Sequence, residues 1–264
     1  MGSATREALA ASRSALADAG KPTLAAAEQL LGAGRAIGGS AQLRGVLADA
    51  EIAIERKQAL LDSIFGASLA PQAKGLLLGL VGRRWSRSDD LLEGIEEIGI
   101  RLAAGSAPAS TAVDAELFAF LQAVIGDAEL ELALASKLAT PETKAGVIAG
   151  LLEGKAHGTT IAILQHLVQQ PRDRRIRPLI EAAADIVADQ AGSEVATVTA
   201  AAPLSPAQRK RLEEGLTASR GRSFRVHVVI DPSILGGLRV KVGDEIVDGT
   251  VASRLQDLKL ALAS

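Results

Sequence analysis

An internal repeat limits the folds open to this chain of 264 residues. Residues 41–95 align with residues 128–182 at a constant offset of 87, without a gap. Identical residues meet at Leu43/Leu130, Leu47/Leu134, Glu55/Glu142, Lys57/Lys144, Leu77/Leu164, Leu80/Leu167, Val81/Val168, Arg87/Arg174 and Leu92/Leu179. Because a gapless register that keeps helical faces together indicates duplication, we predict two copies of one helical unit. The second copy has no evident counterpart of a helix predicted over residues 5–18, so we expect it to be partial.

Apolar periodicity predicts six short helices in the first copy. Leu and Ala recur at helical spacing, and Gly or Pro punctuates the segments between them. The predicted helices cover residues 5–18, 23–37, 41–49, 53–65, 72–83 and 89–104. We therefore expect a six-helix bundle over residues 1–104. Residues 105–112 are small and polar and predict a linker to the second helical unit, residues 113–191.

The pattern changes after Gly192, where β-branched residues begin to alternate. Ser205, Pro206 and Gln208 fit a capping box at the start of a helix. The predicted elements are a strand over 194–202, a helix over 205–219, strands over 223–230 and 238–242, and a final helix from residue 249. The order is β-α-β-β-α, with a parallel crossover followed by an antiparallel return. The chain is thus mainly α-helical, with a small α/β domain over residues 193–264.

Composition excludes several classes of function. Aromatic residues make up 2% of the chain, too few for the stacking platforms of single-strand nucleic-acid binders. The net charge of −2 argues against affinity based on phosphate contacts, and the absence of Cys excludes thiolate sites and disulfides. No apolar run reaches the roughly 18–20 residues that span a bilayer, and the N-terminus lacks a secretion signal. We expect a soluble cytosolic protein without nucleic-acid partners or direct membrane insertion.

The sequence contains only weak matches to the motifs of catalytic, nucleotide-binding or metal-binding sites. Residues 150–155 resemble a P-loop, but only three residues separate the glycines, and Ala156 occupies the metal-binding position. A nucleotide-binding regulator or enzyme using this segment is the alternative function. His157, His166 and His227 have no partner at helical spacing, so neither a metal site nor a cofactor is expected.

Two charged features each allow more than one interpretation. Basic runs at residues 83–87 and 172–177 occupy matching places in the two copies. They are typical of cationic helix ends that continue into solvated turns, but they also fit contact with an acidic partner or, less well, with nucleic acid. Asp244, Glu245 and Asp248 form an acidic cluster that fits either a turn or a cation site.

Residues 229–255 resemble the signature of the ATP synthase delta subunits, the family that includes mitochondrial OSCP. The matching positions are Asp231, Pro232, Gly236, Gly237, Gly243, Asp244, Asp248, Gly249, Arg254 and Leu255. The glycines fit reversals of the chain and the Asp-Gly pair fits a turn, so these are fold-making residues. Residues 202–208 resemble the strand-to-helix junction of the family. The duplicated helical unit and the residues at 84–87 are similar to those of actinobacterial delta subunits.

The resemblance implies a non-catalytic subunit of the peripheral stalk, or stator, of the proton-translocating ATP synthase. Such a subunit couples proton flow to ATP synthesis by joining the catalytic head to the membrane sector. It implies that the helical part receives N-terminal helices of alpha subunits and that the C-terminal domain binds the b subunit. It also implies a peripheral location on the cytoplasmic face of the plasma membrane.

The family's groove for alpha lies between its first and fifth helices, which correspond here to residues 5–18 and 72–83. The resemblance therefore implies that Leu9, Leu16, Leu76 and Leu80 line a groove, the alternative being that these leucines belong to the core. The sequence leaves open which helical copy binds alpha and whether the coupling ion is a proton or sodium.

Overall fold

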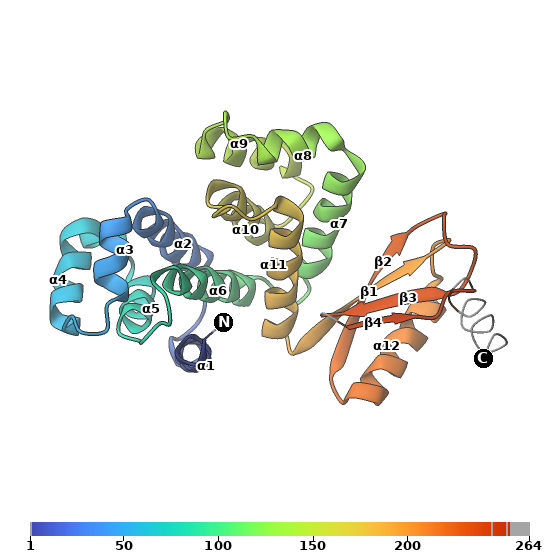
Figure 1. Cartoon of the computed structure of the whole chain (residues 1–264), viewed down its shortest axis with the longest axis horizontal. Coiled ribbons are helices and arrows are strands. Elements are labelled where there is room, and N and C mark those ends of the chain that lie inside the picture. The colour runs from blue at the N-terminus through green and yellow to red at the C-terminus, as the bar shows by residue number, and fades with distance from the viewer. Residues whose placement is uncertain (1, 244, 252, 254–264) are drawn as a thin grey trace, which may run out of the picture. The chain divides into compact units, whose positions relative to one another are not determined.

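The computed structural model describes residues 2–243, 245–251 and 253 and divides the chain into two compact units. The first, Met1–Val187, is helical, and the second, Ala188–Ser264, contains a sheet and a helix that packs on it (Figure 1). This is the mainly α-helical class with a small α/β domain that the sequence predicts.

The first copy of the repeat, called repeat 1 below, contains the six predicted helices. They are α1 (Ser3–Asp18), α2 (Leu24–Gly38), α3 (Ala41–Ala48), α4 (Ile54–Phe65), α5 (Pro71–Val81) and α6 (Ser88–Ser106). A short 3₁₀ turn, Gly66–Ser68, follows α4. The side chains of Thr23 and Ser40 accept hydrogen bonds from the first turns of α2 and α3, which explains where these helices begin.

Repeat 2 follows the same plan, and several of its helix boundaries keep the offset of 87. Its own helices are α7 (Val113–Gly126), α8 (Ala128–Ala135), α9 (Pro141–Leu152), α10 (Gly158–Gln169) and α11 (Ile176–Gln190). Both ends of α8 and α9 lie 87 positions after those of α3 and α4, and α10 begins 87 positions after α5.

Helix α6 belongs to both repeats. Repeat 2 has no first helix of its own, as expected, and the offset carries α1 onto residues 90–105, within α6. The buried residues of α1 correspond to positions of α6 that are also buried. These pairs are Thr5/Leu92, Ala8/Ile95, Leu9/Glu96, Ser12/Gly99 and Leu16/Ala103. Because α1 packs on α5 and α6 packs on α10, α6 both closes repeat 1 and opens repeat 2.

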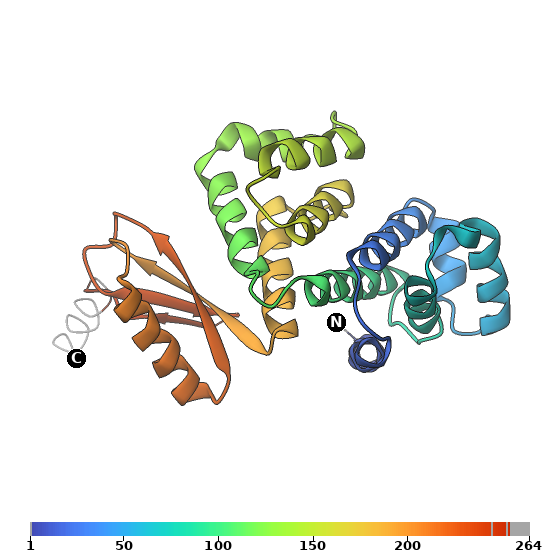
Figure 2. The ribbon, with the colours of Figure 1, turned by 180° about the vertical axis from the view of Figure 1, so that it is seen from behind.

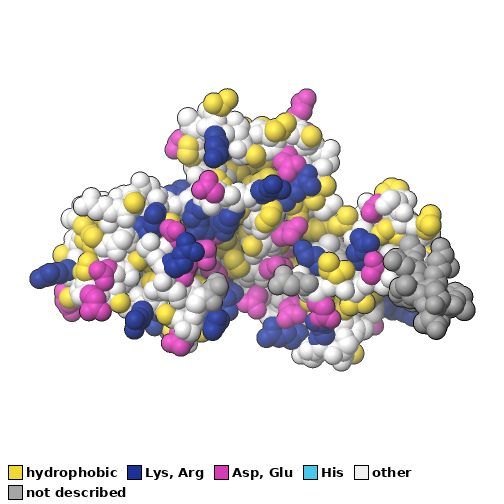
Figure 3. Space-filling view, in the orientation of Figure 1, with side chains coloured by type: hydrophobic (Ala, Val, Ile, Leu, Met, Phe, Trp, Pro, Cys, Tyr) yellow, Lys and Arg dark blue, Asp and Glu magenta, His cyan; other side chains and the backbone are white. Residues whose placement is uncertain are grey.

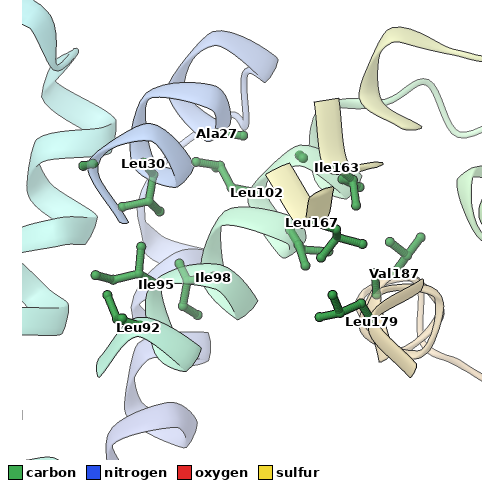
Figure 4. Close-up of a cluster of buried hydrophobic side chains, with 14 of the residues drawn as sticks. Ala27, Leu30, Leu92, Ile95, Ile98, Leu102, Ile163, Leu167, Leu179 and Val187 are labelled. Carbon is green, nitrogen blue, oxygen red and sulfur yellow. The ribbon is translucent and has the colours of Figure 1, made fainter. Parts of the chain in front are cut away.

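One hydrophobic core spans both repeats. In Figure 4 it runs from Ala27 and Leu30 of α2 through Leu102 of α6 to Ile163 and Leu167 of α10. Each of these five side chains is at most 1% exposed. Aliphatic residues make up nearly all of this core, as the low aromatic content requires.

The C-terminal unit is a four-stranded mixed sheet packed on one helix. Its elements are β1 (Ser193–Ala200), α12 (Pro206–Arg220), β2 (Ser223–Ile230), β3 (Leu238–Val242) and β4 (Glu245–Asp248), and the strand order is β2-β1-β3-β4. The parallel β1–β2 pair and the antiparallel return of β3 onto β1 agree with the sequence. Ser205 and Gln208 form the predicted capping box. Strand β4 was not predicted, because four exposed residues after a turn carry little strand pattern.

The family-signature residues make turns. Gly236 and Gly237 have φ values of +155° and +83°, and a Cβ on Gly237 would lie 2.4 Å from the carbonyl oxygen of Gly249. Asp231 accepts hydrogen bonds from the backbone N–H and hydroxyl of Ser233, at 2.9 and 2.6 Å. These contacts explain why the signature needs Gly and Asp here.

Two carboxylates of the acidic cluster near the last turn accept hydrogen bonds from arginines. Arg239 donates to Asp248 at 3.0 Å and Arg220 to Glu245 at 2.6 Å. Asp244, Arg254 and Leu255 lie outside the described residues, as does most of the predicted final helix.

Candidate helix-binding groove

A groove of about 350 Å³ lies between α1 and α5. Figures 1 and 2 both show α1 beside α5 and α6. The groove is lined by Ser12, Ala15, Asp18, Ala19, Pro71, Gln72, Gly75, Leu76, Gly79, Leu80, Arg83 and Ile98. Most of these residues are small or apolar, and a charged residue lies at each end.

Two glycines create the hollow. Gly75 and Gly79 are four residues apart and therefore lie on the same face of α5. Both are exposed, and a Cβ added to either would meet no atom within 4 Å. The missing side chains leave an open strip, bordered by the apolar side chains of Leu76, Leu80 and Ile98.

Two of the four leucines of the predicted groove lie along the hollow between α1 and α5. Leu76 and Leu80 contribute to its lining. All four leucines are buried in the hydrophobic core, and Leu9 and Leu16 are not among the lining residues. Sequence reasoning overlooked Gly75 and Gly79, although their spacing of four within a Leu-rich helix was an available signal.

The first basic run ties α1 to the end of α5. Arg83 donates from Nη2 to the carbonyl of Ala11 at 3.2 Å, and Trp85 donates from its indole nitrogen to the carbonyl of Leu80 at 2.9 Å. The Trp85 bond satisfies one of the carbonyls that are left unpaired at the end of a helix. The Arg83 hydrogen bond joins the two walls of the groove.

The second basic run surrounds a buried carboxylate, Glu96 of α6. Arg174 donates to both of its oxygens, at 2.9 and 2.7 Å, and Arg172 Nη2 lies 2.9 Å from Oε1. His166 of α10 places Nε2 3.5 Å from Oε2. Glu96 is 8% exposed, so this ion cluster is an internal joint between α6 and the segment from α10 to α11.

The side chains of this joint keep the same protonation states near neutral pH. Burial alone would raise the pKa of Glu96, but the nearby His166 ring, hydrogen bonds from Arg174 and the charge of Arg172 lower it to about 2. Burial lowers the pKa of His166, so its ring is neutral. Because Arg35 can only donate, at 3.1 Å to Nδ1, the ring proton lies on Nε2 and faces Glu96. A carboxylate held ionised in this way is unsuited to general acid–base catalysis.

A larger hollow of about 910 Å³ next to the joint has balanced charge. Its lining includes as many arginines as carboxylates, namely Arg35, Arg44, Arg87, Arg172 and Arg174 with Asp89, Asp90, Glu93, Glu142 and Asp173. Figure 3 likewise shows basic and acidic side chains intermixed on the helical unit. A nucleic-acid surface would instead be one-sidedly basic.

The P-loop-like segment has the wrong surroundings for phosphate. Helix α9 ends at Leu152, and Gly154 follows with a φ of +69°. Residues 150–155 thus lie at the carbonyl end of a helix, whereas a P-loop directs backbone N–H groups at phosphate from the start of one.

Within residues 2–243, 245–251 and 253, no group of three or more His, Cys, Asp or Glu could hold a metal ion. No described helix is long and apolar enough to cross a membrane.

A helical repeat unit with an open groove, followed by a small α/β unit, has the features of an adaptor protein that docks partner segments. Comparison with known proteins identifies the adaptor. The family model for the ATP synthase delta (OSCP) subunit matches residues 100–262. The chain is 52% identical to ATP synthase subunit delta of Leifsonia xyli subsp. xyli and 37% identical to that of Streptomyces griseus subsp. griseus, over the full length of each.

A chain of the Toxoplasma gondii mitochondrial ATP synthase hexamer, solved by cryo-EM, is 21% identical, with a TM-score of 0.41 over 65% of this chain and 97% of that one. The protein belongs to the ATP synthase delta (OSCP) subunit family, and it resembles the actinobacterial members in particular. It is a component of the peripheral stalk of ATP synthase. The matched region begins inside α6 and covers repeat 2, so the family model does not align with α1 and α5, where the resemblance had placed the family's first and fifth helices.

Proposed function

We propose that the groove between α1 and α5 receives the N-terminal helix of an ATP synthase alpha subunit, and that the C-terminal unit binds the b subunit. The chain then joins the catalytic head to the peripheral stalk on the cytoplasmic face of the plasma membrane, and it performs no reaction itself. The observation that carries the proposal is the groove, which combines an apolar border with the two exposed glycines Gly75 and Gly79. An amphipathic helix is the kind of partner that such a groove accepts.

Titration of the full chain with a synthetic peptide tests this proposal. The peptide carries the N-terminal residues of the same organism's alpha subunit, and binding is measured by calorimetry. Gly79→Leu should weaken binding at least about tenfold, because the new side chain occupies the hollow. The substitution leaves the fold intact, since no atom lies within 4 Å of the added Cβ.

Gly146→Leu is the matched control. Gly146 is an exposed glycine of α9 that likewise has no neighbour within 4 Å of an added Cβ, and it lies outside the groove. The Gly146→Leu variant should bind the peptide with the same affinity as the wild type. Equal binding by Gly79→Leu and Gly146→Leu would reject the groove as the alpha site.

The C-terminal unit offers a second hollow, of about 540 Å³, for the b subunit. It lies where the turn after β1, the start of α12 and the Gly236–Gly237 reversal meet. Leu235, next to this reversal, is 85% exposed. Leu235→Asp should reduce recovery of a soluble b fragment in a pull-down with purified proteins, while peptide binding to the helical unit stays unchanged. Undiminished recovery of b would place its contact elsewhere.

A further inference from the structure

The two repeats would have equivalent grooves if both were open. The offset of 87 carries the α1–α5 groove onto the space between α6 and α10. Gly75 and Gly79 are exposed, whereas their counterparts Ala162 and His166 are 7% and 1% exposed. Another element of the chain therefore covers the equivalent groove of repeat 2, between α6 and α10.

The covering element is α2. Leu31 packs so closely on α6 that a Cβ added to Gly99 would lie 2.4 Å from it. On the α10 side, Arg35 lies 3.1 Å from His166, and Gln170 donates to the carbonyl of Gly34 at 3.2 Å. Helix α2 thus contacts both walls of the space, as a partner helix would.

The contacts also fix the direction of α2. Leu24, at its start, approaches Gly158 at the start of α10, and Gly38, at its end, lies against Gln170 just after α10. Helix α2 therefore runs parallel to α10. Against α6 the order is reversed, since Leu31 meets Gly99 while the earlier Pro22 meets Gly105.

We infer that the described helices offer one groove for a partner helix, that of repeat 1, and that α2 shows how the partner lies in it. The occupant is an amphipathic helix that runs parallel to α5 and antiparallel to α1. This inference rests on the proposed function of the α1–α5 groove. It also means that α2 of the same chain occupies the groove of repeat 2, the repeat that the family model matches. The partner helix therefore binds to repeat 1.

Charge at the two ends of the groove supports this direction. Asp18 lies at the end where α5 begins, where Gln72 donates to the carbonyl of Ala19 at 2.9 Å. Arg83 lies at the end where α5 stops, and its Nε is buried with no hydrogen-bond partner. An occupant parallel to α5 presents its positive N-terminal end to Asp18 and its negative C-terminal end to Arg83.

Binding stoichiometry tests the number of grooves. Native mass spectrometry and calorimetry of the full chain with the alpha N-terminal peptide should give one peptide per chain, and Gly79→Leu should remove that binding. Binding of two peptides per chain would overturn the single-groove inference. Binding of one peptide that persists in Gly79→Leu but is lost on substitution in α10 would overturn it as well. In both cases the proposal that the chain binds the peptide would stand. No binding at all would overturn the proposed function together with this inference.

Orientation is tested separately with spin labels. The chain has no native Cys, so single Cys residues at exposed Lys21 and Arg84 place a nitroxide near either end of the groove. With isotope-labelled peptide bound, a label at residue 21 should broaden amide signals from the peptide's N-terminal half. A label at residue 84 should broaden those from its C-terminal half. The opposite pattern would overturn the inferred direction.

Discussion

Glu96 is a single residue that distinguishes the two repeats. It occupies the position that Leu9 holds in α1, at the offset of 87. In α1 this position packs into an apolar core, whereas in α6 it holds Arg172, Arg174 and His166 against the helix. A change from apolar to acidic at one buried position thus converts a packing contact into an ionic joint.

Removing this carboxylate should destabilise the helical unit. We expect Glu96→Gln to lower the free energy of unfolding by about 3 kcal/mol at pH 7, because it leaves buried arginine charge unpaired. Trp85, the single Trp and 7% exposed, reports on this unit alone in urea titrations. Asp62→Asn, which breaks the partly exposed pair with Lys74, is the control and should cost less than about 1 kcal/mol.

The same joint should respond to acid. The pKa of Glu96 in the folded chain, about 2, lies below its ordinary value of 4.5. A lowered folded-state pKa contributes stability above the unfolded pKa, and this contribution disappears as the pH falls from about 4.5 towards 2. Wild type should therefore lose more stability than Glu96→Gln over this range. Parallel pH profiles for the two proteins would show that folding does not lower the pKa of Glu96.

Helices of this chain use glycine in two opposite ways. In α6, Gly94 and Gly99 allow Trp85 and Leu31 to approach the backbone. In α5, Gly75 and Gly79 face open space and create the groove. A glycine therefore allows close helix packing where another side chain lies against it. Where no side chain lies against it, it leaves an open groove.

Alanine substitutions should separate the two uses. Gly94→Ala places a Cβ 2.2 Å from the Trp85 ring and should destabilise the helical unit by about 1–3 kcal/mol. Gly146→Ala meets nothing within 4 Å and should stabilise the unit by up to about 1 kcal/mol through helix propensity. Thermal unfolding followed by Trp85 fluorescence measures both. Stabilisation by Gly94→Ala would contradict the close α6–Trp85 contact.

At the scale of the whole molecule, the two units differ in the size of their cores. The helical unit has one core across both repeats, whereas the buried hydrophobic cluster among the described residues of the sheet unit consists of Ala196, Val198, Phe224 and Val226. Partly buried Leu212 and Leu216 of α12 cover this small cluster. Since burial of apolar surface drives folding, the described part of the sheet unit has less buried apolar surface to stabilise it than the helical unit has.

Hydrogen exchange should reveal this difference. Amides of β1 should exchange at least about tenfold faster than those in the middle of α6, because the described part of the sheet unit buries less apolar surface than the helical unit. Mass spectrometry of peptic peptides from the full chain makes the comparison in one sample. Equal or slower exchange in β1 would mean that the small core is supplemented by contacts elsewhere.

The sequence by itself determined the helices, the duplication, the β-α-β-β order and the family, because these depend on local periodicity, capping residues, turn glycines and a short signature. Tertiary structure alone decided the rest. That α6 serves two repeats, that α2 covers one groove and that Gly75 and Gly79 leave the other open all depend on which surfaces meet across long stretches of chain. Periodicity shows that a face is apolar, but whether a neighbour, a partner or nothing lies against it is set by packing in three dimensions.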